Sequence, residues 1–308
     1  MNRSSTIFIA GQDTIIGKSL IKYFKKKHYK NIVNFDYLPP KLTDGRMVKK
    51  YFLKTKPKFI FMLGGLSGGI KMNQDNPASL MMDNLESMIN IFKNAFENKV
   101  KKMFFLASSC VYPKHNQQPM NPEDLMSGIL EPTNSAYAMS KLSGIELCYA
   151  YRKEFGANYI SAIPTNIFGP NDNFNKNESH VIPSLIKKIH EAKVKDKKDV
   201  SIWGTGLPLR EFIYVDDLAN ACIFLMKNYN NLKPINIGTN YVVSIKELTY
   251  KIKKLIGFKG NLVFDKSKPD GMPKKILNSK EILSLGWTPK TCLEEGLANT
   301  YNWFLSKN

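Results

Sequence analysis

In the first half of the chain, short β-type apolar runs alternate with longer stretches of helical spacing. Thr6–Ala10 is a β-rich run, and Ile15–Lys27 follows it with apolar residues spaced as on one face of a helix. Further strands are predicted at Asn31–Phe35, Lys58–Leu63 and Lys102–Ala107. A long amphipathic helix is predicted over 78–97, and a second long helix from about 134 to 155. Such alternation predicts right-handed βαβ units and the α/β class, with a Rossmann-type doubly wound parallel sheet.

After the apolar run Tyr159–Ile167 the pattern becomes less regular. Helices are predicted at 182–193, 216–228, 244–256 and 293–306, and strands at 200–204, 234–237 and 262–264. We therefore expect a nucleotide-binding Rossmann domain over 1–170 and a smaller mixed α/β substrate lobe over 171–308. Some of the chain is expected to cross back to the first domain near 210–240. Ligands of such sheets bind at the carboxyl ends of the strands, which places the site in the cleft between the two parts.

Composition narrows the class of protein. The 308 residues are 43% hydrophobic, which excludes a largely disordered chain. No apolar stretch approaches the roughly 18 residues of a membrane span, and the N-terminus lacks the apolar core of a signal peptide. The four cysteines are widely spaced, with no CxxC pair, which argues against a disulfide scaffold or a metal site. We expect a cytoplasmic protein that binds no metal and no membrane.

The charge is strongly positive, with 45 Lys and Arg against 26 Asp and Glu and a net charge of +19. An excess of this size occurs in proteins that bind nucleic acid or a polyanionic small ligand. Here the lysines are scattered, and no basic run is interleaved with regularly spaced aromatic residues. A solvated surface is therefore favoured, and no nucleic-acid partner is expected.

Two glycines, Gly11 and Gly17, bracket the predicted turn from the first strand to the first helix. Glycines at such a turn allow the backbone to approach a pyrophosphate, which then lies on the helix N-terminus. Thr14 occupies the middle position of the GxxGxxG pattern. Taken alone, the turn is equally compatible with a purely structural role.

A second motif combines Tyr137 and Lys141 in YAMSK with Ser108 at the end of a predicted strand. Residues four apart share a helix face, so the Lys ammonium is expected to lower the pKa of the Tyr hydroxyl while holding a ribose. The Ser hydroxyl completes the relay to a carbonyl oxygen. This set predicts a reductase.

Longer blocks make the assignment more specific. They are GGLSGGI at 64–70, LASSCVYPK at 106–114, LEPTNSAYAMSKLSG at 130–144, PTNIFGPNDNF at 164–174, SHVIPSLIKKIHEAK at 179–193, WGTGLPLREFIYVDDLA at 203–219, INIGT at 235–239 and KPDGMPKK at 268–275. With the two motifs above, they resemble the extended short-chain dehydrogenase/reductase family and, within it, the GDP-L-fucose synthases. The resemblance covers nearly the whole chain.

The resemblance implies epimerisation at C3 and C5 of GDP-4-keto-6-deoxy-D-mannose followed by reduction at C4, giving GDP-L-fucose, a precursor for surface polysaccharide. It assigns Cys110 as the base, His180 as the acid, and Tyr137 as the donor to the C4 oxygen, assisted by Lys141 and Ser108. Without the family context, a strand-end cysteine is usually a small buried apolar group and a lone histidine before a helix a cap. The other cysteines, Cys148, Cys222 and Cys292, are read as packing residues.

The resemblance also implies two sets of binding residues. It places the nicotinamide cofactor against Gly11, Thr14, Ile15, Ile16, Gly17, Asp36, Lys41, Leu106, Ala107, Tyr137, Lys141, Pro164, Thr165, Asn166, Ile167 and His180. It places the GDP-linked 4-keto-6-deoxy sugar against Lys188, Trp203, Arg210 and Asp270. The structural alternatives are a core position for Trp203 and an ion pair of Arg210 with Glu211. Lys188 stands where the family has an arginine, so a bidentate phosphate contact becomes a point charge.

The form of the cofactor stays open at this level. Family descent implies NADP(H), whereas Asp13 stands where a basic residue often reads the 2′-phosphate. Asp36 lies about 20 residues past the turn, where an acid normally bonds the ribose 2′-hydroxyl of NAD(H). Lys41 is the nearby cation available to a 2′-phosphate, and the Thr14 side chain is expected to crowd the pyrophosphate.

Other functions also remain open. Enzymes of this type act on GDP-4-keto-6-deoxy-heptoses, and some relatives reduce C4 without epimerising. A Rossmann protein that has lost turnover and senses a ligand or redox state is the alternative of another class. Extended relatives commonly form homodimers, here through the helices near 78–97 and 134–155.

Overall fold

The computed structural model describes residues 1–175, 178–268 and 270–307 of the chain. Its α-helices are α1(Ile15–Lys26), α2(Val33–Asp36), α3(Gly45–Thr55), α4(Ile70–Asp75), α5(Pro77–Glu97), α6(Ser135–Phe155), α7(Val181–Val194), α8(Val215–Asn228), α9(Ile245–Ile256), α10(Lys280–Ser284) and α11(Leu293–Leu305). Its strands are β1(Ile7–Ala10), β2(Phe59–Met62), β3(Lys102–Leu106), β4(Tyr159–Pro164), β5(Asn166–Phe168), β6(Asp199–Trp203), β7(Leu209–Tyr214), β8(Ile235–Ile237), β9(Val242–Ser244), β10(Asn261–Asp265) and β11(Lys274–Lys275).

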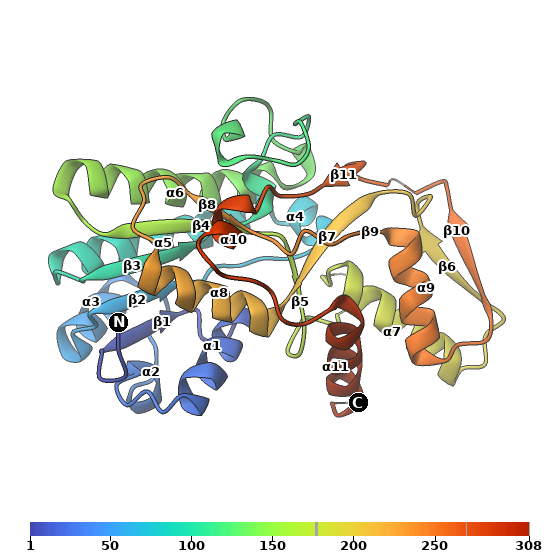
Figure 1. Cartoon of the computed structure of the whole chain (residues 1–308), viewed down its shortest axis with the longest axis horizontal. Coiled ribbons are helices and arrows are strands. Elements are labelled where there is room, and N and C mark those ends of the chain that lie inside the picture. The colour runs from blue at the N-terminus through green and yellow to red at the C-terminus, as the bar shows by residue number, and fades with distance from the viewer. Residues whose placement is uncertain (176–177, 269, 308) are drawn as a thin grey trace.

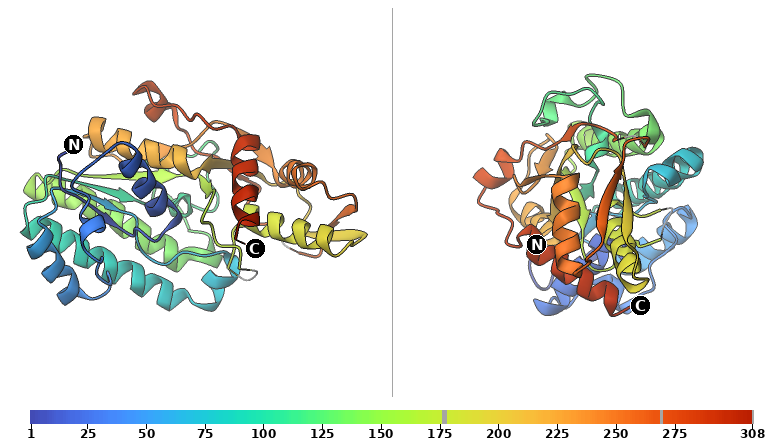
Figure 2. Two further views of the ribbon diagram at one scale, coloured as in Figure 1. Left: turned by 90° about the horizontal axis from the view of Figure 1, so that it is seen from below. Right: turned by 90° about the vertical axis from the view of Figure 1, so that its right-hand side faces the viewer.

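A parallel sheet with the strand order β1-β2-β3-β4-β8 forms the centre of the first part. Helices α3, α5 and α6 cover one face, and α1 and α8 cover the other (Figures 1 and 2). Successive residues of each strand are buried on opposite faces: Ile7 and Ile9 pack in the core beside α1 and α8, and Phe8 in the core beside α3 and α5. The predicted fold class, a doubly wound parallel sheet, is confirmed.

The second part carries two smaller sheets, one of β11, β7 and β5 with β9 beside β7, and one of β10 and β6 (Figure 1). The chain changes sheets at Thr165, between β4 and β5. Its N–H donates to Ile237 O of β8 at 2.9 Å, and its hydroxyl donates to Glu211 O of β7 at 2.9 Å. These bonds join the first sheet to β7 next to the carboxyl end of β4. A domain boundary at residue 170 stays a prediction.

The predicted strand at Asn31–Phe35 is wrong, because residues 33–36 form the short helix α2. Only Ile32 pairs with β1, opposite Ile7. Further along β1, the Asn34 side chain takes the place of a strand: its Oδ1 accepts from Ile9 N–H at 2.8 Å, and its Nδ2 donates to Ile9 O at 2.9 Å. An amide side chain carries the same donor and acceptor as a peptide group, so it satisfies the edge of β1 without an extended backbone.

We expect Asn34→Ala to lower the free energy of unfolding by about 1–3 kcal/mol, because it leaves both polar groups of a buried residue unpaired. Denaturant unfolding measures the loss. Asn261→Ala is the control, since the exposed Asn261 amide donates only to a surface carboxylate of Asp199. Equal effects of the two substitutions would show that Asn34 does not secure the edge of β1.

Candidate active site

The turn after β1 is packed so closely that two of its positions exclude any side chain. Gly11 has φ +102°, and a Cβ there would lie 2.5 Å from Gly64 N, just past β2. A Cβ on Gly17 would lie 2.2 Å from Gly11 O. The first turn of α1 therefore lies directly against the ends of β1 and β2, as the approach of a backbone to a pyrophosphate requires.

Thr14 is the N-cap of α1. Its Oγ1 donates to Gly11 O at 2.7 Å and accepts from Gly17 N–H at 3.0 Å, so the hydroxyl is turned into the loop. This orientation differs from the crowding expected of its side chain. The N–H groups of Ile15 and Ile16 lie in the first turn of the helix, where no intrahelical acceptor exists, and they are suited to an anion. The residues present fit a dinucleotide pyrophosphate.

Asp13, Asp36 and Lys41, which the family resemblance associates with the adenosine part of the cofactor, are all exposed. Asp36 is the last residue of α2. Burial is the main cause of the raised pKa of Tyr51, and the charge of Asp36 adds to it. Lys41 precedes Leu42, whose Cδ1 lies 2.6 Å from the Cβ position of Gly64. The segment that carries Lys41 therefore folds over the carboxyl end of β2, on the same side as the glycine turn.

The remaining predicted cofactor residues lie at the ends of neighbouring strands. Leu106 ends β3 and Ala107 follows it, Pro164 ends β4, and Asn166 and Ile167 begin β5. Because parallel strands end at the same edge of the sheet, these residues and the glycine turn line one edge.

Tyr137 and Lys141 lie one turn apart on α6, with the Lys141 Nζ 5.6 Å from the centre of the Tyr137 ring. The Tyr137 hydroxyl is hydrogen-bonded to the Ser108 side chain. Lys141 Nζ donates to Gly64 O at 3.4 Å, which ties α6 to the glycine turn. The structure thus brings together the predicted trio beside the dinucleotide groove.

The electrostatics of this trio differ from the expectation that Lys141 lowers the pKa of Tyr137. Burial, as the larger effect, and the neighbouring Cys110 raise the pKa of Tyr137, and the bond to Ser108 opposes this only in part. Burial lowers the pKa of Lys141 to about 8, against an opposing effect of Asp83. Tyr137 is therefore held in the protonated form, ready to donate a proton.

Cys110 lies in a one-turn 3₁₀ helix just after β3, where two side-chain donors point at its sulfur. Asn134 Nδ2 donates to the Cys110 Sγ at 3.3 Å, and Lys275 Nζ donates to it at 3.5 Å. Asn134 is the N-cap residue of α6, yet its side chain makes no capping bond. We did not assign Asn134 or Lys275 from the sequence, although both lie in blocks that carry the family resemblance.

His180 is the N-cap residue of α7, and its side chain reaches solvent although many protein atoms surround it. Burial by the surrounding protein and, to a lesser degree, the charge of Lys275 lower the pKa of His180. Lys275 therefore lies close to both proposed proton-transfer residues. Neighbouring members of the site are therefore linked to one another: Tyr137 to Ser108 and Cys110, and Lys275 to Cys110 and His180.

The predicted substrate residues lie at the edge of the second part. Trp203, at the end of β6, is 65% exposed and is not a core residue. Asp270 accepts from the Thr205 N–H at 2.6 Å, and its charge acts on the half-buried Arg210. Lys188 Nζ donates to the backbone O of residue 201 in β6 at 3.0 Å.

Glu211 is fully buried and does not pair with Arg210. Its carboxylate accepts the backbone N–H groups of Thr239, Asn240 and Leu277. Because neighbouring strand residues face opposite ways, Arg210 lies on the other side of β7 from the buried Glu211 carboxylate, where the charge of Asp270 acts on it. The ion pair considered from the sequence is therefore absent from this part of the structure.

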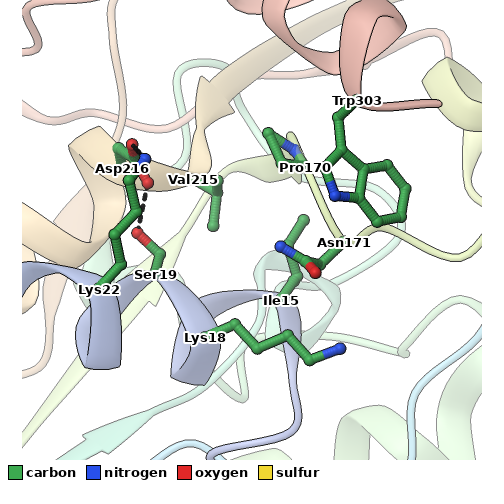
Figure 3. Close-up of a pocket in the computed structure, with 9 residues that line it drawn as sticks. All are labelled: Ile15, Lys18, Ser19, Lys22, Pro170, Asn171, Val215, Asp216 and Trp303. Carbon is green, nitrogen blue, oxygen red and sulfur yellow. Dashed lines mark hydrogen bonds and ion pairs between the residues drawn. The ribbon is translucent and has the colours of Figure 1, made fainter. Parts of the chain in front are cut away.

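A separate hollow of about 280 Å³ opens between α1, the loop after β5 and α11 (Figure 3). Lys22 and Ser19 both bind Asp216 on its wall, at 2.8 and 2.6 Å. Ile15 lines it, but Tyr137, Cys110 and His180 do not. Over the described residues, no group of three metal-ligating side chains was found, and no helix is long and apolar enough to cross a membrane.

Comparison with known proteins agrees with this arrangement. The model of the NAD dependent epimerase/dehydratase family matches residues 7–238. The GDP-L-fucose synthase of Sinorhizobium fredii is 46% identical over 300 residues, covering 97% of this chain and 95% of that protein.

Solved structures extend the likeness to the three-dimensional fold. A GDP-6-OMe-4-keto-L-xylo-heptose reductase from C. jejuni has a TM-score of 0.93 at 31% identity, covering 100% of this chain and 99% of that one. A GDP-L-fucose synthetase from Naegleria fowleri bound to NADP has a TM-score of 0.90 at 30% identity, covering 100% and 96%. The chain belongs to the NAD dependent epimerase/dehydratase family, the extended short-chain dehydrogenases/reductases, within which several of its curated relatives are GDP-L-fucose synthases.

Proposed function

We propose that this protein epimerises C3 and C5 of GDP-4-keto-6-deoxy-D-mannose and then reduces C4 with NADPH, giving GDP-L-fucose. The observation that carries the proposal is the sulfur of Cys110, which accepts from Asn134 and Lys275 beside the Tyr137 hydroxyl. Reduction alone needs a proton donor to the C4 oxygen but no base, whereas epimerisation beside a ketone needs both a base and an acid.

The chain's own residues supply the proton transfers. Cys110, as thiolate, removes the proton from a carbon next to the C4 ketone and becomes a thiol, leaving an enolate with its charge on the C4 oxygen. His180, which takes up a proton from solvent in each cycle, gives that proton to the carbon from the opposite face, which inverts it. NADPH, when bound, supplies the hydride for C4. As the carbonyl is reduced, Tyr137 gives its hydroxyl proton to the C4 oxygen.

The groove after β1 binds the cofactor, with its pyrophosphate on the first turn of α1. NADP(H) is the form that agrees with the NADP-bound Naegleria fowleri relative. Lys41, which follows the exposed Asp36 by five residues, is proposed to contact the 2′-phosphate. Arg210, Trp203, Lys188 and Asp270 are proposed to hold the GDP-linked sugar at the other side of the cleft.

The decisive experiment is cofactor oxidation with GDP-4-keto-6-deoxy-mannose in deuterated water, with NADPH and NADH in parallel. Oxidation of NADPH with deuterium at C3 and C5 of the product supports the epimerase/reductase. Oxidation without deuterium replaces it by a plain C4 reductase. A faster reaction with NADH contradicts the cofactor assignment.

A GDP-4-keto-6-deoxy-heptose is the second candidate substrate, because the C. jejuni heptose reductase matches the whole fold. The same assay distinguishes the two by their relative kcat/KM. Absence of turnover with either sugar would leave the non-catalytic sensor as the remaining function.

The rate of reduction is expected to fall about tenfold per pH unit above pH 8. Burial lowers the pKa of Lys141 to about 8, so its ammonium is present below that pH and lost above it. The pKa of Tyr137 is raised and that of His180 lowered, so neither changes its charge between about pH 7 and 9. In a pH profile of kcat/KM, Lys141→Arg should move the alkaline limb to higher pH. If the alkaline limb stays at the same pH in Lys141→Arg, the loss of rate at high pH is caused by another group.

Two further assignments extend the proposal. A homodimer is proposed through α5 and α6, which expose six large apolar residues: Met82, Ile89, Phe96, Met139, Tyr149 and Phe155. Light scattering measures the mass in solution, and a monomer would refute the dimer. The four cysteines are all unpaired, in keeping with the reducing cytoplasm as the site of action and with a supply of NADPH.

A further inference from the structure

The ammonium of Lys275 lies against the sulfur of Cys110, although 165 residues separate them in the chain. The Nζ–Sγ distance is 3.5 Å. Among the described residues no ion pair joins Lys275 to a carboxylate, so the sulfur is the group that faces its charge. An anionic sulfur would satisfy this contact far better than a neutral thiol.

The backbone that carries Lys275 is held from several sides. Strand β11 pairs in parallel with β7, which places Lys275 opposite Arg210. The next residue, Ile276, accepts from Met120 N–H at 2.9 Å and donates to the Gln118 side chain at 2.9 Å. Beyond it, the N–H of Leu277 donates to the buried carboxylate of Glu211 at 3.2 Å. These contacts present the ammonium to Cys110 from a fixed backbone.

The other groups around the sulfur agree with a negative charge there. The Asn134 side-chain amide donates a hydrogen bond to the sulfur and makes no capping bond to α6. Lys275 also disfavours a second positive charge on His180. The ammonium of Lys275 thus lies against Cys110 and also acts on His180.

We propose that Lys275 is the positioning residue that keeps the Cys110 sulfur anionic before substrate arrives, and so prepares it as the base. The use of the thiolate as a base rests on the proposed function. The charge state of the sulfur is independent of that function, because it is a property of the protein without substrate. No co-reactant is needed. The thiol first loses its proton to water, and the proton that the thiolate later takes from the sugar is released to water after each turnover.

The test is the rate at which iodoacetamide alkylates Cys110 near neutral pH, read by peptide mass spectrometry on the intact chain without substrate. Only the thiolate attacks the reagent, so the rate follows the thiolate fraction. The exposed Cys292 is an internal standard, and Cys148 and Cys222 are buried. Lys275→Met removes the charge and keeps the aliphatic stem. Lys275→Arg restores the charge, and Lys274→Met is the matched control on the opposite face of β11.

We expect the ratio of Cys110 to Cys292 alkylation to fall about tenfold in Lys275→Met, and to stay near the wild-type value in Lys275→Arg and Lys274→Met. An unchanged ratio in Lys275→Met overturns the proposal. An equal fall in Lys275→Arg also overturns it, because the lost feature would then be the lysine's shape. Thermal unfolding and NADPH binding measured on each variant confirm that the fold is kept. Since no sugar is present, failure of the proposed substrate would leave this result intact.

Discussion

Replacing Tyr137 by phenylalanine is expected to lower kcat for C4 reduction by about 10³-fold. Burial, as the larger effect, and the neighbouring Cys110 raise the pKa of the phenol and so hold it protonated, and it is hydrogen-bonded to Ser108. It is therefore placed to give a proton to the C4 oxygen as hydride arrives. Phenylalanine keeps the ring and its packing on α6 but has no proton to give, so the loss is in the chemical step and not in the fold.

The prediction separates reduction from epimerisation. Tyr137→Phe should still exchange C3 and C5 protons of the keto sugar with deuterated water, because Cys110 and His180 are intact. NADPH oxidation and NMR of the recovered sugar measure the two activities in one sample. Tyr250→Phe is the control, since Tyr250 lies on the helix α9 and is exposed. Full reduction by Tyr137→Phe would remove Tyr137 from the proton-donor role.

Replacing Cys110 by serine is expected to suppress deuterium entry at C3 and C5 by about 10²–10³-fold, while direct reduction at C4 continues. A serine hydroxyl stays protonated near neutral pH and cannot serve as the base, even with the Lys275 ammonium beside it. Tyr137, Lys141 and Ser108 remain in place to reduce the unepimerised ketone. The product should therefore change from GDP-L-fucose to the C3 and C5 unepimerised 6-deoxy sugar.

Chromatography and NMR of the product distinguish these outcomes. Cys292→Ser is the control, because Cys292 is an exposed thiol at the start of α11, away from the cleft. Exchange at both carbons at the wild-type rate in Cys110→Ser would show that the base is another residue. Loss of both exchange and reduction, with the fold kept, would assign Cys110 a part in hydride transfer as well.

The long helices show how far local spacing predicts this fold. The apolar spacing over 78–97 and 134–155 predicted α5 and α6 to within a residue of their ends, because each helix buries one continuous face. At Asn31–Phe35 the same reasoning failed. The β-type residues there suggested a strand, but a side chain, Asn34, completes the edge of β1, and period alone does not reveal such a bond.

The candidate site divides in the same way. Gly11, Gly17, Ser108, Tyr137 and Lys141 could be found because strand–turn–helix order places them at one edge of a parallel sheet. Cys110 and His180 came from the family resemblance. Lys275 lies on a strand of two residues, too short to give a pattern, and reaches the site only because β11 pairs with β7.

The order of apolar runs and helical faces was thus enough to specify the α/β class, the glycine turn and the tyrosine–lysine pair, because each depends on contacts within a few residues or on neighbouring strand ends. The charge state of the site was decided by the tertiary structure. Burial raises the pKa of Tyr137 and lowers that of Lys141, and an ammonium from the far end of the chain meets the sulfur of Cys110. Such electrostatic effects depend on the distances between groups in the folded protein and on their burial, and neither can be read from the spacing of residues along the chain.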